Sequence, residues 1–284
     1  MKVKLKKIIE SNKILKKMYI VLYAKRREQK WYWVMWKLPI FRIKQLFRLM
    51  GITSKRYKTL KKYKNIHKGE RCFIIATGPS LTIEDLNLLK NEYTFGMNSL
   101  CKLFPEIGWE TTYYVIQDIG AFNLLIDDVI KLKKTVFFYG DQWFKKRDIK
   151  KLRCKTQIFP RYYEHHGYDQ EHFKTHFSLN AYSIVYEAYT VAVATMQLAA
   201  YMGFTEIYLL GADCNYTQET KKESYSCGLS YGEELPNRKM FGNKMIYAYS
   251  VAKQELEKKR INVYNATRGG MLEEFVRVNL EDIL

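Results

Sequence analysis

The fold of this chain is decided by the stretch CFIIATGPSL, residues 72–81. Its first five residues are apolar or small and follow the charged Arg71, a pattern typical of a short strand that is buried on both faces of a sheet. The strand then breaks at Thr-Gly-Pro-Ser, residues 77–80, because glycine and proline both favour a turn. We therefore expect a strand, a turn and a helix in this order, with Ser80 as the cap of the helix.

The turn has the residues of a ligand-binding loop. Gly78 allows a ligand to approach the backbone closely, and Pro79 fixes the next φ angle. Backbone amides exposed at the start of the following helix would suit a phosphate. With only one fixed glycine, the same residues fit a plain strand-to-helix turn equally well, and both interpretations stay open at this point.

The charge of the chain is concentrated at one end. The 284 residues carry a formal net charge of +19, and residues 1–70 alone hold 22 Lys and Arg against 3 Asp and Glu. Residues 71–284 hold equal numbers of basic and acidic residues, which is typical of an ordinary globular domain. We therefore predict two parts: a basic segment, 1–70, and a domain, 71–284, which has a length that can bury a sizeable core.

Large apolar side chains alternate with the charges of residues 1–70. Their spacing of three and four predicts two or three amphipathic helices, broken near Pro39 and after Gly51. Basic residues on one side and tryptophan and leucine on the other are typical of a segment on an anionic membrane surface. A nucleic-acid arm needs fewer bulky aliphatic residues, so we expect no nucleic acid partner. A helical hairpin that docks on a partner protein is a further interpretation.

Cysteine usage and hydropathy predict the compartment. The five cysteines are odd in number and widely spaced, without a C-x-x-C pair, which favours a reducing compartment over a disulfide frame or zinc site. Neither a secretory signal nor an apolar run of membrane-spanning length is present. We expect a cytoplasmic protein that is peripheral on the inner face of the plasma membrane.

From Arg71 onward, strand and helix patterns alternate. Such alternation predicts a single Rossmann-like α/β domain with a mainly parallel sheet. Strands are expected at 72–76, 93–97, 111–116, 135–139, 206–210 and 261–264, and helices at 188–202 and 244–259. In an open parallel sheet the strand ends line one crevice where ligands bind.

Polar residues follow several of the predicted strands. They are Asn98 and Ser99, then Gln117 and Asp118, then Asp141, then Gly211 and Asp213, and finally Thr267 and Arg268 beside two glycines. Arg268 would suit an anionic ligand, although a solvated arginine in a turn fits as well. Asp213 has two interpretations that stay open, a turn cap and a catalytic acid or base.

Two irregular stretches interrupt the pattern. Residues 145–180 hold four of the five histidines, and we interpret them as an exposed loop or lid. The pair His172 and His176 has the i, i+4 spacing of a helical metal site but lacks the H-E-x-x-H arrangement, so we expect no metal. Residues 214–243 are polar and tyrosine-rich and are predicted to form a second lid.

Residues 70–280 resemble the bacterial sialyltransferases that build lipooligosaccharide and capsule termini. They also resemble the domains shared by motility accessory factors and the archaeal hydroxymethylpterin diphosphokinase. The most specific parts are Gly78-Pro79-Ser80-Leu81, then Asn98, then the run from Met202 to Asp213.

That resemblance implies a sialyltransferase-type domain that uses a CMP-activated nonulosonic acid as donor, without metal and with inversion at the anomeric centre. By position, Thr77, Gly78, Pro79 and Ser80 would contact the nucleotide. Asn98, Gln117 and Asp118 would contact ribose or donor sugar. Tyr216 and Tyr225 would hydrogen-bond the departing phosphate.

The chain departs from the sialyltransferases at four positions of this pattern. They have Asn where this chain has Thr77, an Arg and a Ser where it has Ala188 and Val191, and their catalytic histidine aligns with Asn243. Asparagine cannot act as a general base, and a general base typically contributes a factor of about 10² to 10⁴. The base would then be Asp213, Glu233, Glu234 or a histidine of residues 165–176, or the chemistry is not sialyl transfer.

Three functions follow from the sequence. The first is a glycosyltransferase of bacterial surface polysaccharide that takes a nucleotide-sugar donor and a glycan or lipid-linked acceptor at an anionic membrane surface. The second is a pterin diphosphokinase-like phosphotransferase, for which Asp118, Asp141 and Asp213 would hold magnesium. The third is a non-catalytic nucleotide-binding scaffold. Assembly as a homo-oligomer is compatible with each.

Overall fold

The chain forms two compact units, Met1–Ile52 and Thr53–Leu284. The computed structural model describes residues 39–52, 55–141, 149–162, 175–215 and 238–284. The described part of the first unit contains one helix, residues 39–49, and the second unit contains the sheets. Among the described residues, no helix has both the length and the apolar composition that crossing a membrane requires.

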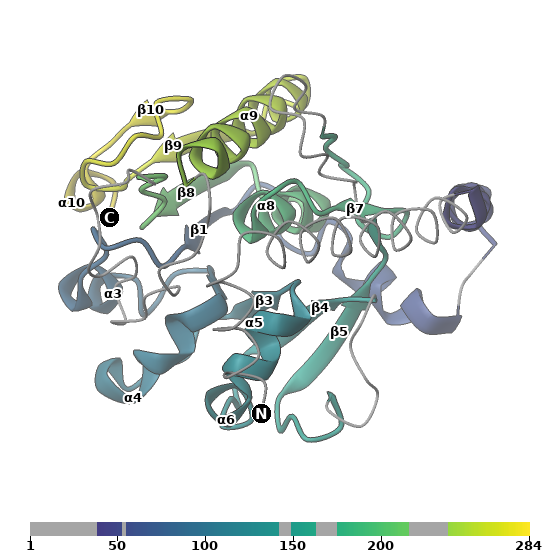
Figure 1. Cartoon of the computed structure of the whole chain (residues 1–284), viewed down its shortest axis with the longest axis horizontal. Coiled ribbons are helices and arrows are strands. Elements are labelled where there is room, and N and C mark those ends of the chain that lie inside the picture. Colours follow the sequence, from purple (N-terminus) through teal and green to yellow (C-terminus); the bar gives the residue numbers. More distant parts are fainter. Residues whose placement is uncertain (1–38, 53–54, 142–148, 163–174, 216–237) are drawn as a thin grey trace, which may run out of the picture. The chain divides into compact units, whose positions relative to one another are not determined.

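The described strands of the second unit form one eight-stranded sheet and one two-stranded sheet (Figure 1). The larger sheet has the order β10-β9-β8-β1-β2-β3-β4-β5, and all its neighbouring strands are parallel. Its strands are β1 (Arg71–Ile75), β2 (Thr94–Met97), β3 (Tyr113–Ile116), β4 (Val136–Gly140), β5 (Lys155–Phe159), β8 (Glu206–Leu210), β9 (Asn262–Asn265) and β10 (Val276–Arg277). The smaller sheet pairs β6 (Arg161–Tyr162) with β7 (Val185–Tyr186). The predicted α/β domain with a mainly parallel sheet is confirmed.

Helices cover both faces of the large sheet. One face packs against α3 (Ile83–Leu88), α4 (Phe104–Ile107), α5 (Ile119–Leu124), α6 (Ile126–Val129) and α10 (Leu280–Ile283). The other packs against the 3-10 helix η1 (Lys55–Tyr63), α8 (Val191–Met202) and α9 (Arg238–Glu257). A second 3-10 helix, η2 (Asn98–Lys102), follows β2.

The position of strand β1 in the sheet explains why its sequence does not alternate between apolar and polar residues. Cys72 and Ile74 enter the core on the α8 face, and Phe73 and Ile75 enter the core on the α3 face. Successive side chains of a strand point to opposite faces, so a strand covered on both faces needs apolar residues at every position.

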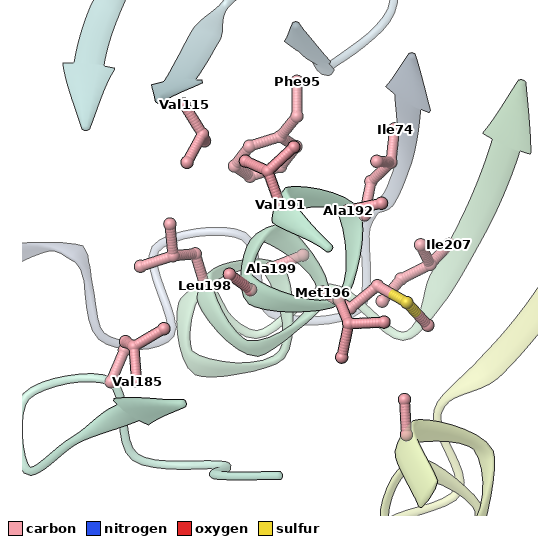
Figure 2. Close-up of a cluster of buried hydrophobic side chains, with 14 of the residues drawn as sticks. Ile74, Phe95, Val115, Val185, Val191, Ala192, Met196, Leu198, Ala199 and Ile207 are labelled. Atoms are coloured by element: carbon pink, nitrogen blue, oxygen red, sulfur yellow. The ribbon is translucent and has the colours of Figure 1, made fainter. Parts of the chain in front are cut away.

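Helix α8 is the centre of one of these cores, as its sequence predicts. Every residue from Val191 to Met202 except Ala200 is buried. Figure 2 shows its side chains between those of the strands, with Ile74, Phe95 and Ile207 facing the helix. The Thr190 side chain accepts a hydrogen bond from the Ala192 amide at the start of the helix, and Gly203 ends it at a φ of 97°. A helix that is apolar on all sides is stable only when it is enclosed in this way.

The structure corrects three sequence predictions. The α/β unit begins at Thr53, not at residue 71, because Tyr57, Leu60 and Tyr63 of η1 are buried in the α8 core. Thr82 caps helix α3 through a capping box with Asp85, whereas Ser80 was predicted as the cap. Residues 145–180 contain β5 and β6, so this stretch is not only a loop; β5 was missed because its sequence, KTQIF, has few apolar residues.

His67, in the segment between η1 and β1, contacts residues at the amino edge of the sheet. The ring of His67 stacks on Phe204 with a centroid distance of 4.4 Å. Its Nε2 lies 2.6 Å from the hydroxyl of Tyr113, and its Nδ1 lies 2.5 Å from Glu70 Oε2. These contacts, together with the backbone bond from His67 N–H to Met202 O, fix the segment between η1 and β1.

We predict that replacing Leu60 by alanine lowers the free energy of unfolding by about 2–5 kcal/mol. Leu60 is fully buried, and the substitution leaves a cavity in the α8 core. Thr59→Ala, at the exposed neighbouring position, is the matched control and should change stability by no more than about 0.5 kcal/mol. Urea unfolding of the full chain measures both values, and equal small effects would contradict a domain that starts at Thr53.

Candidate functional site

The topological switch point of the sheet lies between β1 and β8. From β1 the chain proceeds through β2, β3, β4 and β5 on one side, whereas β8, β9 and β10 lie on the other side. In open α/β sheets, ligands bind outside the carboxyl ends of the strands at such a point. The segments that follow β1 and β8 are therefore the first part of the candidate site.

Asp213 joins these two segments. Its Oδ2 accepts a hydrogen bond from Ser80 Oγ at 2.8 Å, and its Oδ1 accepts one from the Ser80 amide at 3.3 Å. A backbone bond of 2.8 Å runs from Gly78 N–H to Gly211 O. The structure thus brings together four residues that the sequence predicted for one site: Gly78, Ser80, Gly211 and Asp213.

Close packing around Asp213 explains why residues 78 and 270 are glycines. A Cβ on Gly78 would lie 1.8 Å from Asp213 Oδ2 and 2.4 Å from Gly211 O. A Cβ on Gly270, in the loop after β9, would lie 2.7 Å from Asp213 O. Three loops, after β1, β8 and β9, therefore meet at Asp213 with no space for another side chain.

The backbone amides of the first turn are directed into the protein. Gly78 N–H donates to Gly211 O, Leu81 N–H to Gly78 O, and Thr82 N–H to Asp85 Oδ2. The Ser80 amide donates to Asp213, and Pro79 has no amide hydrogen. The amides of residues 78 and 80–82 are therefore engaged within the protein, and a phosphate at the amides that start α3 stays a prediction.

The environment of Asp213 fits a positioning role. Burial raises the pKa of Asp213, and the hydrogen bonds from Ser80 oppose this rise. The residue is 8% exposed, and both of its carboxylate oxygens accept hydrogen bonds from Ser80. Of the two interpretations left open by the sequence, these contacts agree with a carboxylate that holds two turns together, and the catalytic role of Asp213 stays a prediction.

The ends of β2 and β3 carry the second group of predicted residues. Asn98 is half-buried and has a φ of 47°, and its carbonyl oxygen accepts a hydrogen bond from the Tyr114 hydroxyl. Ser99 is buried in η2. Asp118 caps α5 by accepting a hydrogen bond from the Ala121 amide at 2.9 Å. Only strand β2 separates β1 from β3, so these residues share one edge of the sheet with Gly78.

Gln117 has an unsatisfied amide oxygen. The residue is 7% exposed, and its Nε2 donates to the backbone oxygen of Glu187 at 3.2 Å. Its Oε1 is buried and has no hydrogen-bond partner. A buried acceptor without a donor costs about 1–3 kcal/mol, so it needs an explanation, and a ligand is one.

A buried ion pair that the sequence analysis missed surrounds Gln117. The guanidinium of Arg161, which is 2% exposed, lies 3.0 Å from Glu187 Oε1 and also donates to the backbone oxygen of Gln117. The Arg161 amide donates to Asp141 Oδ1 at 3.1 Å. Arg161 lies in a stretch expected to be a loop, and no spacing in the sequence connects it to Glu187.

Uncommon backbone conformations gather along the same edge. Asn98, Ala188, Tyr189 and Cys214 have φ angles of 47°, 51°, 60° and 51°. Asn98 follows β2, Ala188 and Tyr189 follow β7, and Cys214 follows β8, at the ends where the candidate residues lie. Non-glycine residues in this region carry a conformational cost and concentrate at binding sites and switches.

Helix α9 contributes a second residue that the sequence analysis missed. Asn243, which aligns with the catalytic histidine of the sialyltransferases, is exposed, whereas its neighbour Lys244 is 5% exposed. Burial lowers the pKa of Lys244, and its Nζ lies 5.7 Å from the centre of the Tyr189 ring. Lys244 lies at i, i+4 spacing from the buried Ala248 and Ala252, on the apolar side of the helix. A lysine on an apolar side is the pattern in the sequence that could have indicated a buried lysine here.

The loop after β9 borders a cavity of about 490 Å³. Thr267 is buried, and its Oγ1 accepts a hydrogen bond from the Ala212 amide at 3.1 Å, which ties this loop to the segment after β8. Arg268 lines the cavity, but its guanidinium is paired with Asp85 at 2.6 Å and Glu281 at 3.1 Å. An anion could therefore bind Arg268 only in competition with two carboxylates.

Some predicted residues lie outside the part of the chain that the structure describes. They are Tyr216, Tyr225, Glu233, Glu234, His165, His166 and His172. Of the first turn, Thr77 is buried and Pro79 is exposed. Across the described residues, no group of three or more His, Cys, Asp or Glu is placed to hold a metal ion.

Comparison with known proteins identifies a family and a solved structure of similar fold. A family model described as 6-hydroxymethylpterin diphosphokinase MptE-like matches residues 48–219. The structure of MAf glycosyltransferase from Magnetospirillum magneticum AMB-1 superposes with a TM-score of 0.50 at 15% sequence identity. That match covers 77% of this chain and 37% of the other, so this chain spans little more than a third of that protein. No curated protein matches.

We predict that Gly78→Ala destabilises the protein by about 1–3 kcal/mol. The added methyl group would overlap the Asp213 carboxylate and the Gly211 carbonyl, and overpacking of this size forces the backbone to move. Pro79→Ala, at the exposed next position, is the control and should have the smaller effect. Thermal unfolding distinguishes them; a Gly78→Ala protein as stable as the parent would show that the three loops are not closely packed.

We also predict that Asp213 makes stability depend on pH. Its pKa in the folded chain is raised above the ordinary value of 3.8, so the protonated form favours folding. This contribution is complete below pH 3.8 and is lost as the pH rises through the raised pKa. The stability of the parent relative to Asp213→Asn should fall over that window.

Urea unfolding at a series of pH values tests this expectation. Ser80→Ala removes a hydrogen bond that opposes the rise in the pKa of Asp213, so this variant should extend the window to higher pH. A stability difference between the parent and Asp213→Asn that stays constant with pH would contradict the assignment.

Proposed function

This chain belongs to the 6-hydroxymethylpterin diphosphokinase MptE-like family, and on that premise we propose that it is a transferase with a nucleotide-activated donor. The proposed donor site is the carboxyl edge of the sheet from β1 to β3. The observation that carries the proposal is Gln117, whose buried amide oxygen lacks a donor at the end of β3. A ligand hydroxyl or amino group would supply that donor.

We propose glycosyl transfer as the reaction, with a CMP-activated sugar as donor and a surface glycan or lipid-linked glycan as acceptor. The resemblance of Gly78-Pro79-Ser80-Leu81 and the run ending at Asp213 to sialyltransferases supports this choice. The fold that the chain shares with MAf glycosyltransferase is compatible with it. In this proposal Asp213 and Ser80 hold the first turn in place, and the amide oxygen of Gln117 accepts a hydrogen bond from the sugar donor.

Positive charge for the departing phosphate is proposed to come from Lys244. Lys244 is a buried residue in the first half of α9, and its ammonium lies beside the ring of Tyr189, whose backbone has a φ of 60°. Desolvation strengthens the attraction between an ammonium and a phosphate, because water no longer screens it. Tyr216 and Tyr225 keep the phosphate-binding role that the resemblance implies.

The second candidate is diphosphate transfer to a pterin alcohol, which the description of the family favours. The three aspartates considered for magnesium do not form one set. Asp118 caps α5, Asp141 accepts hydrogen bonds from Tyr57 and Arg161, and Asp213 binds Ser80. Strands β3 and β8 are three positions apart in the sheet, about 14 Å, which is too far for one ion.

Ligand-induced stabilisation separates the candidates. We expect CMP or CDP to raise the melting temperature without magnesium, since a ligand that binds only the native state stabilises it by about 2.7 kcal/mol at 100 times its Kd. A rise that requires both ATP and magnesium would favour diphosphate transfer instead. Nucleotide binding without turnover of any sugar donor would favour a non-catalytic scaffold.

Two matched substitutions test the role of Gln117. Gln117→Met removes the unsatisfied oxygen together with the hydrogen bond from Nε2 to the Glu187 carbonyl, so the two effects on stability offset each other. We expect stability to change by less than about 1 kcal/mol and nucleotide binding to weaken about tenfold. Gln197→Met is the control, because Gln197 Oε1 accepts hydrogen bonds from the Ser178 and Tyr186 amides, both at 3.0 Å. It should destabilise the chain by more than about 1 kcal/mol. Calorimetric titration and urea unfolding measure the two effects; unchanged affinity in Gln117→Met would remove Gln117 from the site.

A membrane location completes the proposal. We propose that residues 1–70 hold the protein on an anionic membrane surface, where a lipid-linked acceptor is concentrated. Helix 39–49 and the residue that follows it support this, because Ile40, Ile43, Phe47 and Met50, spaced by three and four, are 53%, 51%, 47% and 73% exposed. Exposed apolar side chains beside basic ones are typical of helices in the membrane interface.

A further inference from the structure

Helix η1 carries a row of cations on the surface of the α/β unit. Tyr57, Leu60 and Tyr63 recur at every third position and are buried, as the threefold repeat of a 3-10 helix requires. The positions between and after them hold exposed basic residues, which we name the η1 basic strip: Lys55, Arg56, Lys58, Lys61, Lys62, Lys64 and Lys68. Residues 55–68 contain no acidic residue.

The charges of the strip are largely uncompensated. Within the described residues, no ion pair or hydrogen bond engages the side chains of Lys55, Lys58, Lys62, Lys64 or Lys68. Elsewhere in the unit, lysines such as Lys102 and Lys131 are paired with a carboxylate. Like charges in one row repel each other, and an anionic partner removes this cost.

The strip is held rigidly by the domain. The Tyr57 hydroxyl donates to the Asp141 carboxylate, and Tyr63 packs edge-on against Phe138 at 5.2 Å between ring centres. After η1, the amides of Asn65 and His67 donate to the carbonyl oxygens of Tyr201 and Met202 at 3.2 and 2.9 Å. The cations therefore form a fixed surface and not a tail that moves independently.

One end of the strip reaches the edge of the sheet where the candidate site lies. Arg56 donates a hydrogen bond of 3.0 Å to the backbone oxygen of Asp141, directly after β4. Gln117, after β3, belongs to the neighbouring strand, and Arg161 contacts both Gln117 and Asp141. A flat anionic surface against the strip would thus lie beside this edge.

We propose that the η1 basic strip is a lipid-binding surface of the α/β unit itself, which contacts anionic headgroups in addition to residues 1–52. The partner is a bilayer because the segment that precedes the strip by a few residues, helix 39–49, exposes apolar side chains that a nucleic acid would not bury. Each lysine near an anionic bilayer contributes roughly a fivefold gain in affinity. The inference extends the membrane part of the proposed function and does not depend on the reaction.

The test uses the full chain and phosphatidylcholine vesicles with and without phosphatidylserine. Lys58→Glu combined with Lys62→Glu should weaken sedimentation with the anionic vesicles at least about tenfold at low salt. The matched control is Lys90→Glu with Lys259→Glu, two exposed lysines on other surfaces, which changes the net charge equally. The control should lose much less binding, and high salt should weaken binding of the parent.

Three results would overturn the proposal. They are equal losses in the two double variants, unchanged binding in the strip variant, and binding of a short DNA duplex by the parent with no binding of anionic vesicles. Melting temperature verifies that the strip variant is folded. A nucleotide-induced shift that is absent from parent and variants alike would reject the donor site alone, because vesicle binding is measured without nucleotide.

Discussion

The Asp213 carboxylate, packed into the space that Gly78 leaves empty, is the contact on which this edge of the sheet depends. It accepts two hydrogen bonds from Ser80, and the backbone of Asp213 lies against Gly270. One residue thus fixes the loops after β1, β8 and β9 relative to one another. A larger side chain at either glycine would move the loops apart, and a shorter one at Asp213 would leave the half-buried Ser80 amide without this acceptor.

This packing divides the edge into two regions. Around Asp213 the polar groups form hydrogen bonds within the protein, so this region supports the loops structurally. Near β3 they are not, because Gln117 has an acceptor without a donor while the buried pair of Arg161 and Glu187 holds it in place. Positive φ angles at Asn98, Ala188 and Tyr189 border the same region. Rigid support beside an unsatisfied group is what a preorganised binding site requires.

The positive charge of the chain is distributed unevenly. The excess positive charge belongs to residues 1–70, yet the last part of that segment, η1, is an integral part of the α/β unit. Its tyrosines and leucine complete the core while its lysines remain outside. A stretch that composition assigns to a basic appendage therefore also builds the domain, and it brings cations close to the edge of the sheet that carries the candidate site.

The sequence by itself determined the parallel α/β fold, the buried strand at residues 72–76, the enclosed helix α8 and the meeting of Gly78 with Asp213, because these follow from local apolar patterns and from where strands end. It did not determine that η1 belongs to the domain, that Thr82 and not Ser80 caps α3, or that Arg161, Glu187 and Lys244 lie at the edge. Those features depend on contacts between residues far apart in the chain. No local pattern encodes such contacts, so only the tertiary structure decided which polar groups became partners and that the amide oxygen of Gln117 is among the buried atoms left without one.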